Sequence, residues 1–200
     1  GLAGYRGIDL VPSEQWKKIV RFPREFSIEG YLGGSAVETD LYFSQSALEH
    51  FSKDLEFMDD LQTQVAASSR PSLQIHVVPG RSQILLSWAH GWRTYGPRNL
   101  ERLARKAPTG SNVFLVGIGG PALNRLQLRA TTIPRISEKI LNKLTAWRPT
   151  EVRLKAALAQ DRSARPSKLQ HRYSFYALVI ETGKASVFNG VGQPYLGGTP

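Results

Sequence analysis

The sequence predicts an α+β protein: a mostly antiparallel sheet with single helices packed on one face. Three observations support this prediction. Short runs in which polar and apolar residues alternate, typical of half-buried strands, recur along the chain. Single amphipathic helical patterns separate these runs, and Gly or Pro turns join neighbouring ones. Hairpins that alternate with single helices favour an α+β architecture over a parallel sheet.

The first ninety residues are predicted to hold two strand pairs separated by one long helix. Gly33-Gly34 and Pro79-Gly80 each lie between two alternating runs, which is the signal of a hairpin. Between these pairs, apolar residues recur every three or four positions over 44–65, which predicts one helix with an acidic outer face. The predicted strands are 26–30, 36–43, 73–77 and 84–88.

The remaining residues are predicted to hold short helices between longer strands. The continuous apolar run at 112–118 is typical of a central strand. Further strands are expected at 126–132, 173–180 and 185–188, the last two as a hairpin around Thr182-Gly183. Helical spacing predicts helices at 99–106, 137–147 and 151–160.

The chain is predicted to form one domain, because its 200 residues suit a single large unit and no clear linker interrupts it. We expect two lobes within this domain, divided near residues 90–110. The expected parts are an arm at 1–24, the α+β domain at 25–188 with an acidic lobe at about 25–90 and a basic lobe at about 110–188, and a Gly/Pro-rich tail at 189–200.

Charge is distributed unevenly along the chain. Residues 1–69 hold 6 basic and 11 acidic residues, whereas residues 70–200 hold 20 basic and 5 acidic ones. Such asymmetry indicates an acidic partner for the basic part, most often nucleic acid. Most of the cations in the basic part are Arg, whose planar fork suits phosphate and stacks on bases.

Composition excludes several classes of function. The absence of Cys removes disulfides, thiol catalysis and zinc-thiolate or iron–sulfur sites. The four His residues lack metal-ligand spacing, so we expect no metal site. No apolar run approaches the ~18 residues of a membrane span, and we expect a soluble, cytoplasmic chain. The start lacks Met and a signal-peptide pattern, which we interpret as a processed product.

Two stretches of the basic part predict a nucleic-acid interface. The first interleaves aromatic residues with cations, as single-stranded nucleic acid requires for base stacking and phosphate contact. The second resembles an arginine-rich segment that follows phosphates. The predicted phosphate contacts are Arg93, Arg98, Arg102, Arg105, Lys106, Arg148, Arg153, Lys155, Arg162, Arg165, Lys168 and Arg172, and the predicted stacking residues are Trp92, Tyr95 and Tyr173.

Candidates for catalysis are few, and the sequence leaves open whether the chain is an enzyme. His171 is the candidate for metal-free cleavage of a phosphodiester, as a general acid or base. His76 also lies on a predicted strand, but the positions two residues after His76 and His171 hold Val78 and Tyr173, which do not match the pattern of two-histidine phosphoesterases. Carboxylates concentrate in the helix at 44–65, where they are interpreted as a solvated face.

One glycine-rich turn follows the strand predicted at 112–118. Gly117-x-Gly119-x-x-Ala122 has the spacing with which dinucleotide folds present backbone amides to a pyrophosphate. No acidic residue ends a following strand, and no Lys-Ser/Thr pair follows the glycines. We therefore expect no cofactor and keep nucleotide binding as a third hypothesis.

The leading hypothesis is a nucleic-acid-binding protein, with RNA favoured over DNA, that acts through the basic lobe. The acidic helix at 44–65 would face away or dock a protein partner. The alternative is a non-enzymatic assembly protein, such as a virion, secretion-apparatus or toxin–immunity component. Its acidic and basic segments would then pair between copies or with a partner.

Overall fold

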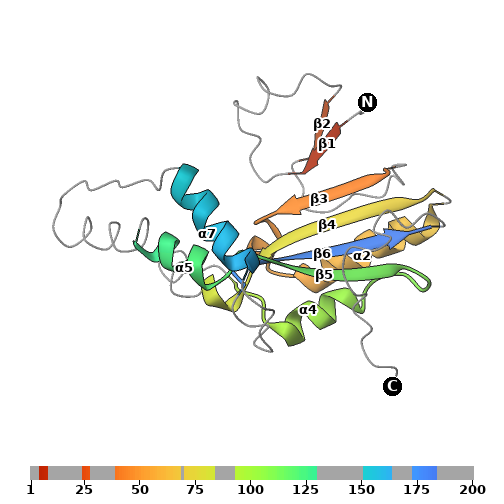
Figure 1. The fold of residues 1–200 in the computed structure, drawn as a ribbon. Coiled ribbons are helices and arrows are strands. Elements are labelled where there is room, and N and C mark those ends of the chain that lie inside the picture. The colour runs from red at the N-terminus through yellow and green to blue at the C-terminus, as the bar shows by residue number, and fades with distance from the viewer. Residues whose placement is uncertain are drawn as a thin grey trace.

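The computed structural model describes residues 5–8, 24–27, 39–68, 70–83, 93–129, 151–163 and 173–183, with residues 5–8, 24–27 and 162–163 described by their backbone alone. Within these residues the chain has the predicted α+β architecture (Figure 1). The strands are β1 (Tyr5–Ile8), β2 (Arg24–Ser27), β3 (Leu41–Gln45), β4 (Ser72–Pro79), β5 (Asn112–Ile118) and β6 (Phe175–Thr182). The helices are the 3-10 turns η1 (Leu48–His50) and η2 (Arg81–Gln83), and α2 (Asp54–Ala67), α4 (Pro97–Ala104), α5 (Pro121–Gln127) and α7 (Glu151–Ser163).

The main sheet has the strand order β3-β4-β6-β5. β6 pairs antiparallel with both β4 and β5, whereas β3 pairs parallel with β4. The sheet is therefore mixed, which corrects the prediction of a mostly antiparallel sheet. Two of its strand pairs are antiparallel and one is parallel. The parallel pair arises because α2 carries the chain back between β3 and β4, which a short hairpin turn could not do. Strands from both predicted lobes, β3 and β4 from one and β5 and β6 from the other, share this one sheet.

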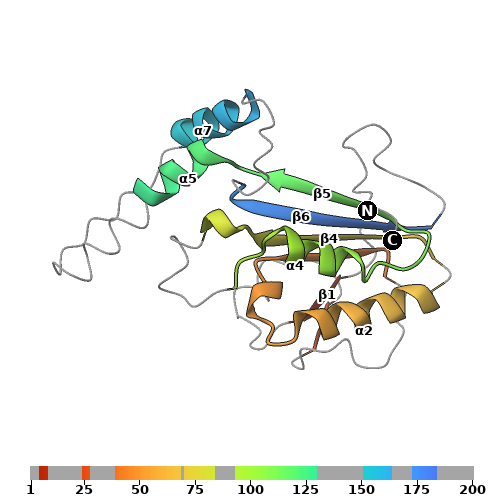
Figure 2. The same ribbon diagram turned by 90° about the horizontal axis from the view of Figure 1, so that it is seen from below.

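Helices α2 and α4 cover one face of the sheet, while α5 and α7 pack together beyond its end (Figure 2). Met58, Leu61 and Val65 of α2 are buried at the helical spacing that the sequence predicts. They pack with Leu100 and Leu103 of α4 and with the alternate positions of the strands that point toward the helices. This helix-covered face holds the larger part of the core.

The opposite face of the sheet is also apolar. Phe114 of β5 and Ala177 and Val179 of β6 are buried at its centre, and β4 adds a partly buried apolar row. At its two edges the large apolar side chains are exposed; Phe43 of β3, for example, is 60% exposed. Among the described residues, no helix covers this face (Figure 2).

Several predicted elements are confirmed at or near their predicted positions. The strands at 73–77, 112–118 and 173–180 correspond to β4, β5 and β6, and the helices at 99–106 and 151–160 to α4 and α7. β5 lies at an edge of the described sheet, however, and not in its centre. The helix predicted at 44–65 is divided, because η1 precedes α2 and the chain is extended at Phe51 between them.

Other predictions are wrong or fall outside the described residues. The strand predicted at 126–132 overlaps α5, which begins at Pro121. β2 pairs parallel with β1 in a separate two-stranded sheet, so it is not in a hairpin with β3. β3 and β6 flank β4 on its two edges, which leaves no room for a hairpin partner. The strands predicted at 84–88 and 185–188 and the helix at 137–147 lie outside the described residues.

Candidate functional site

The candidate site lies beyond the carboxyl ends of the two parallel strands. α2 follows β3, and α4 follows β4, so both helices begin on this side of the sheet. The segment that leads into α4 is fixed to the end of β4, because the backbone N–H of Tyr95 donates to the carbonyl of Pro79 at 2.8 Å. The crevice outside the carboxyl ends of parallel strands is a common place for ligands in open sheets.

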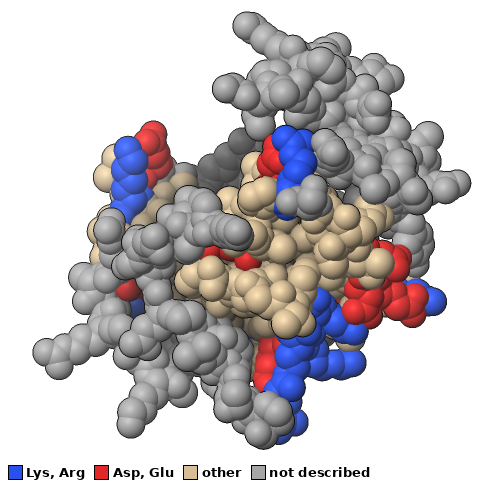
Figure 3. Space-filling view, turned by 90° about the vertical axis from the view of Figure 1, so that its right-hand side faces the viewer, with Lys and Arg blue, Asp and Glu red and all other residues tan. Residues whose placement is uncertain are grey.

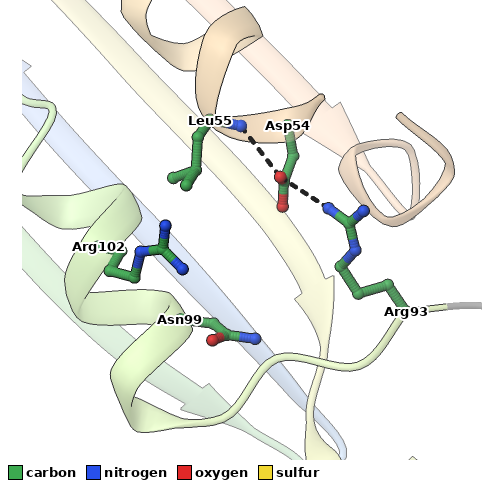
Figure 4. Close-up of a pocket in the computed structure, with 5 residues that line it drawn as sticks. All are labelled: Asp54, Leu55, Arg93, Asn99 and Arg102. Carbon is green, nitrogen blue, oxygen red and sulfur yellow. Dashed lines mark hydrogen bonds and ion pairs between the residues drawn. The ribbon is translucent and has the colours of Figure 1, made fainter. Parts of the chain in front are cut away.

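A cavity of about 150 Å³ opens at this position. Asp54 and Leu55 contribute to it from the start of α2, and Asn99 and Arg102 from α4 (Figure 4). Arg93 closes the remaining side, from the segment before α4. The lining is thus mostly polar, and its cations come from two segments of the chain.

Asp54 is the centre of a hydrogen-bond network that joins these segments. Arg93 Nη1 lies 2.6 Å from Asp54 Oδ1, and the backbone N–H of Leu55 donates to the same oxygen at 3.0 Å. The Tyr95 hydroxyl donates to Asp54 Oδ2 at 2.8 Å. The hydrogen bond to Asp54 raises the pKa of Arg93, and burial, followed by the bond to Asp54, raises the pKa of Tyr95. Asp54 therefore fixes Arg93 at the edge of the cavity.

Arg102 and Asn99 are the polar side chains of the cavity for which the described residues provide no side-chain partner. Within the described part of the chain, Arg102 has no acidic partner, and the Asn99 carboxamide makes no side-chain hydrogen bond. Arg102 is exposed, and both side chains point toward the cavity (Figure 4). The cavity therefore holds two guanidinium groups and one carboxylate, a net charge of +1. Such a site suits a small anion that accepts hydrogen bonds.

The structure brings the five predicted cations from Arg93 to Lys106 around α4, but three of these cations have intramolecular partners. Arg93 contacts Asp54, Arg105 contacts Glu101 at 2.7 Å, and Lys106 contacts Asp59 at 2.6 Å. Only Arg98 and Arg102, four residues apart on α4 and both exposed, have no acidic partner among the described residues. On the face shown in Figure 3, basic side chains likewise lie next to acidic ones.

The remaining predicted contacts are not joined to this group. Arg153 and Lys155 lie on α7, which Figures 1 and 2 place away from α4. Lys155 pairs with Glu151 at 2.7 Å. The backbone of Arg162 belongs to the same helix. Trp92, Arg148, Arg165, Lys168, His171 and Arg172 lie outside the described residues.

Two of the three predicted stacking residues have roles within the fold. Tyr95 is only 1% exposed and belongs to the core, so its ring has no free face for a base. Tyr173 packs on Tyr176 with an interplanar angle of 76°. A Cβ on Gly117 would lie 2.5 Å from the Tyr173 ring, which shows how closely that ring contacts β5. We therefore assign base stacking to neither residue.

His76 belongs to a buried polar network below α2. Its Nδ1 lies 2.9 Å from Ser44 Oγ, and its Nε2 lies 3.4 Å from Gln74 Oε1. Gln74 and Gln62 exchange two amide hydrogen bonds of 2.8 Å, which hold α2 on β4. His76 is 2% exposed, and burial lowers its pKa to about 4. The imidazole is thus neutral and enclosed, which is the arrangement of a packing residue and not of a general acid.

The glycine-rich turn after β5 is filled by a carboxylate of the same chain. Asp161 of α7 accepts hydrogen bonds from the backbone N–H groups of Ala122 and Leu123, both at 2.9 Å. A Cβ on Gly120 would lie 2.8 Å from Asp161 Cγ, and Gly119 adopts a φ of 68°, which favours glycine. The amides that a pyrophosphate would need are therefore occupied, so we do not propose nucleotide binding there.

Asp54 and Asn99 are the site residues that sequence reasoning missed. Asp54 was expected on a solvated acidic face, yet its side chain is 14% exposed and pairs with Arg93, which lies 39 positions later. Glu49, expected on the same face, is 5% exposed, and burial raises its pKa. The only local signal for Asn99 is its position one helical turn before Arg102.

The described residues offer neither a membrane span nor a metal cluster. None of their helices combines the length and hydrophobicity that crossing a membrane requires. No three of their His, Asp or Glu residues lie close enough together to hold a metal ion. Comparison of the whole sequence with protein-family models and with curated proteins finds no match.

Proposed function

We propose that this protein binds nucleic acid, with RNA favoured over DNA, through the exposed arginines of α4 and the cavity beside them. The observation that carries the proposal is the pair Arg98 and Arg102. They lie one helical turn apart, are exposed and have no acidic partner among the described residues. Their guanidinium groups are free to donate to phosphate oxygens, and Arg forms such contacts in a bidentate geometry.

The charge and size of the cavity fit one phosphate of a nucleic-acid backbone. A phosphodiester carries a single negative charge, which matches the net charge of +1 from Arg93, Arg102 and Asp54. The volume of the cavity is about 150 Å³. Such a volume admits a phosphate group and leaves the attached nucleosides outside, along α4.

Asn99 supports the preference for RNA. Its carboxamide can donate and accept hydrogen bonds, and so can the ribose 2′-hydroxyl that distinguishes RNA from DNA. Since Asn99 lines the cavity beside Arg102, a sugar next to the bound phosphate comes within its reach. The paired cations Arg105 and Lys106 contribute less to binding, because phosphate must compete with their carboxylate partners.

The test is fluorescence anisotropy with labelled single-stranded RNA and DNA over a series of salt concentrations. The double substitution Arg98→Ala and Arg102→Ala removes two phosphate contacts. It should therefore make the slope of log affinity against log salt shallower by about 1.5 to 2 and weaken binding at least about tenfold. Asn99→Ala should reduce the preference for RNA while leaving the slope unchanged.

Arg125 and Arg129 provide the matched control. They are also four residues apart and exposed, but they lie on and just after α5, away from α4 (Figure 1). Arg125→Ala with Arg129→Ala makes the same change in charge and should leave the slope near that of the unmodified protein. Equal effects of the two double substitutions, or no binding at low salt, would contradict the proposal.

A second candidate, self-association, is favoured by the apolar face of the sheet that no described helix covers. Leu41 and Phe43 are exposed at one edge of this face, and Val116 and Ile118 at the other. A net charge of +10 makes two copies repel each other, but the strand residues on this face include no Lys or Arg. Two such faces could therefore pack at the usual sheet spacing of about 10 Å. Light scattering should then show a dimer that Phe43→Ser dissociates, whereas a monomer at all concentrations would exclude this candidate.

A further inference from the structure

We propose that the cavity between α2 and α4 selects phosphodiesters and rejects terminal phosphomonoesters, with Asp54 as the residue that determines this specificity. The inference rests on the proposed function and names the ligand of the same site. The group bound would be an internal phosphate of an RNA strand. A strand end that carries a free phosphate would be excluded from the cavity.

The argument begins with the fixed position of Asp54. Three donors hold its carboxylate: the Arg93 guanidinium, the Tyr95 hydroxyl and the backbone N–H of Leu55. Arg93 also donates from Nη2 to the carbonyl of Ser52 at 3.3 Å. The carboxylate cannot rotate out of the cavity without leaving the buried Tyr95 hydroxyl unpaired. A negative charge is therefore built into a site that attracts anions.

This negative charge limits how much charge the ligand can bring. Arg93 neutralises Asp54, and Arg102 remains to balance the ligand. A monoanionic diester balances Arg102 and makes the site neutral. A dianionic monoester would leave an excess negative charge in the same small cavity as the Asp54 carboxylate, and neighbouring like charges repel. The cavity also lacks a second free cation among the described residues that line it.

The Asn99 carboxamide adds a requirement of shape to this limit on charge. It is the uncharged polar group among the described lining residues and lies next to Arg102 (Figure 4), where the ester oxygen or hydroxyl of an attached sugar would be. An internal phosphate has a sugar on both sides, so one sugar meets Asn99 while the charged oxygens meet Arg102. A terminal phosphate has a sugar on one side only, and an ionisable oxygen stands where an internal phosphate has its second ester oxygen.

The test compares dimethyl phosphate with methyl phosphate, which have a similar size but differ in charge. Methyl phosphate loses its second proton near pH 6, so it is mainly a monoanion at pH 5 and a dianion at pH 8. Dimethyl phosphate keeps one charge over this range and reports any titration of the protein itself. Binding is measured by the nuclear magnetic resonance shift of the Asn99 side-chain amide, which the Asn99→Asp variant assigns.

We expect dimethyl phosphate to bind equally at both pH values and methyl phosphate to bind at least about tenfold more weakly at pH 8 than at pH 5. Asp54→Asn should abolish this difference. The pH comparison on the unmodified protein is sufficient by itself if that variant does not fold. Methyl phosphate that binds at pH 8 as tightly as dimethyl phosphate would overturn the inference while leaving the proposed function intact. Absence of any shift, together with RNA binding unaffected by Arg102→Ala, would overturn both.

Discussion

The start of α2 and the start of α5 are each held by one aspartate, but only the first lies beside the cavity that we propose as an anion site. At α2, Asp54 accepts from Arg93, Tyr95 and its own helix, and Arg102 beside it has no acidic partner in the described part of the chain. At α5, Asp161 accepts from two backbone N–H groups. The first aspartate holds a cation at the edge of a cavity, whereas the second itself accepts from the backbone N–H groups of the glycine-rich turn.

This difference shows why a glycine-rich turn is a weak indication of phosphate binding. The turn after β5 has the spacing of a phosphate-binding loop, and its backbone N–H groups do bind an anion. That anion is a carboxylate of the same chain, brought there by the packing of α7 on α5. A motif describes which donors are available locally, but only the fold decides what reaches them.

The largest expected effect on stability comes from the titration of His76. The two aspartates are therefore compared at pH 7, where His76 is mainly neutral in both the folded and the unfolded chain. Its pKa is about 4 in the folded protein, against 6.5 for a histidine in an unfolded chain. Below pH 6.5 the unfolded chain takes up a proton that the folded protein refuses. Stability is therefore fully present above about pH 6.5, falls as the pH is lowered toward 4, and loses about 3 kcal/mol in total.

Urea denaturation at pH 7 and pH 4 measures this loss, with the non-titrating variant His76→Gln as control. Glu49 acts in the opposite direction, because its raised pKa gives stability that is lost as the pH rises. The difference between the variant and the unmodified protein isolates His76. Equal losses in the two proteins would show that His76 does not set the acid limit.

Asp54→Ala should be the more damaging of the two aspartate substitutions, with a loss of about 2–3 kcal/mol at pH 7. It leaves the Tyr95 hydroxyl, which is buried, without an acceptor, and it frees Arg93 from its anchor. Asp54→Asn keeps an acceptor oxygen and should lose about half as much. Denaturation in urea at pH 7 measures both losses, and a smaller loss for Asp54→Ala than for Asp161→Ala would reverse the comparison.

The sequence predicts well those parts of the fold that depend on local pattern. Alternation placed β4 and β6, an apolar run placed β5, and helical spacing placed α7. The failures depend on contacts between distant residues. The run after Leu126 alternates like a strand, but Asp161 pairs with the amides at the start of α5 and favours a helix there. The parallel pairing of β3 with β4 cannot be read locally, because it depends on the path of the chain through α2.

The candidate site was predictable to a similar extent. The sequence predicts a short basic helix at 99–106, which includes Arg102 but begins after Arg98; in the structure α4 begins at Pro97 and both arginines are exposed on it. Tyr95 was expected to stack on a base, but it lies in the core. Composition alone cannot distinguish an aromatic residue in the core from one on the surface. Asp54 was missed because its partners Arg93 and Tyr95 lie about forty residues later, and the local sequence does not show such a pairing.

Asp161→Ala should cost less than the loss of Asp54, about 1–2 kcal/mol. The amides of Ala122 and Leu123 lose their acceptor, but the Asp161 side of the contact is only partly buried, so water can replace the carboxylate. Hydrogen exchange at these two amides should become faster. Lys155→Ala on the same helix is the control. Its pair with Glu151 is exposed, so it should cost less than about 0.5 kcal/mol, and an equal cost for both would remove the special role of Asp161.

Tyr95→Phe should have the smallest effect of the series, about 1 kcal/mol, because it removes the hydroxyl and keeps the ring in the core. The same change in the Asp54→Ala protein should be neutral or stabilising, since it removes a buried donor that has already lost its acceptor. Urea denaturation of the four proteins gives the coupling between the two residues. A cost for Tyr95→Phe that does not depend on Asp54 would mean that the hydroxyl does not hold the carboxylate, and Arg93 alone would then fix Asp54 in the cavity.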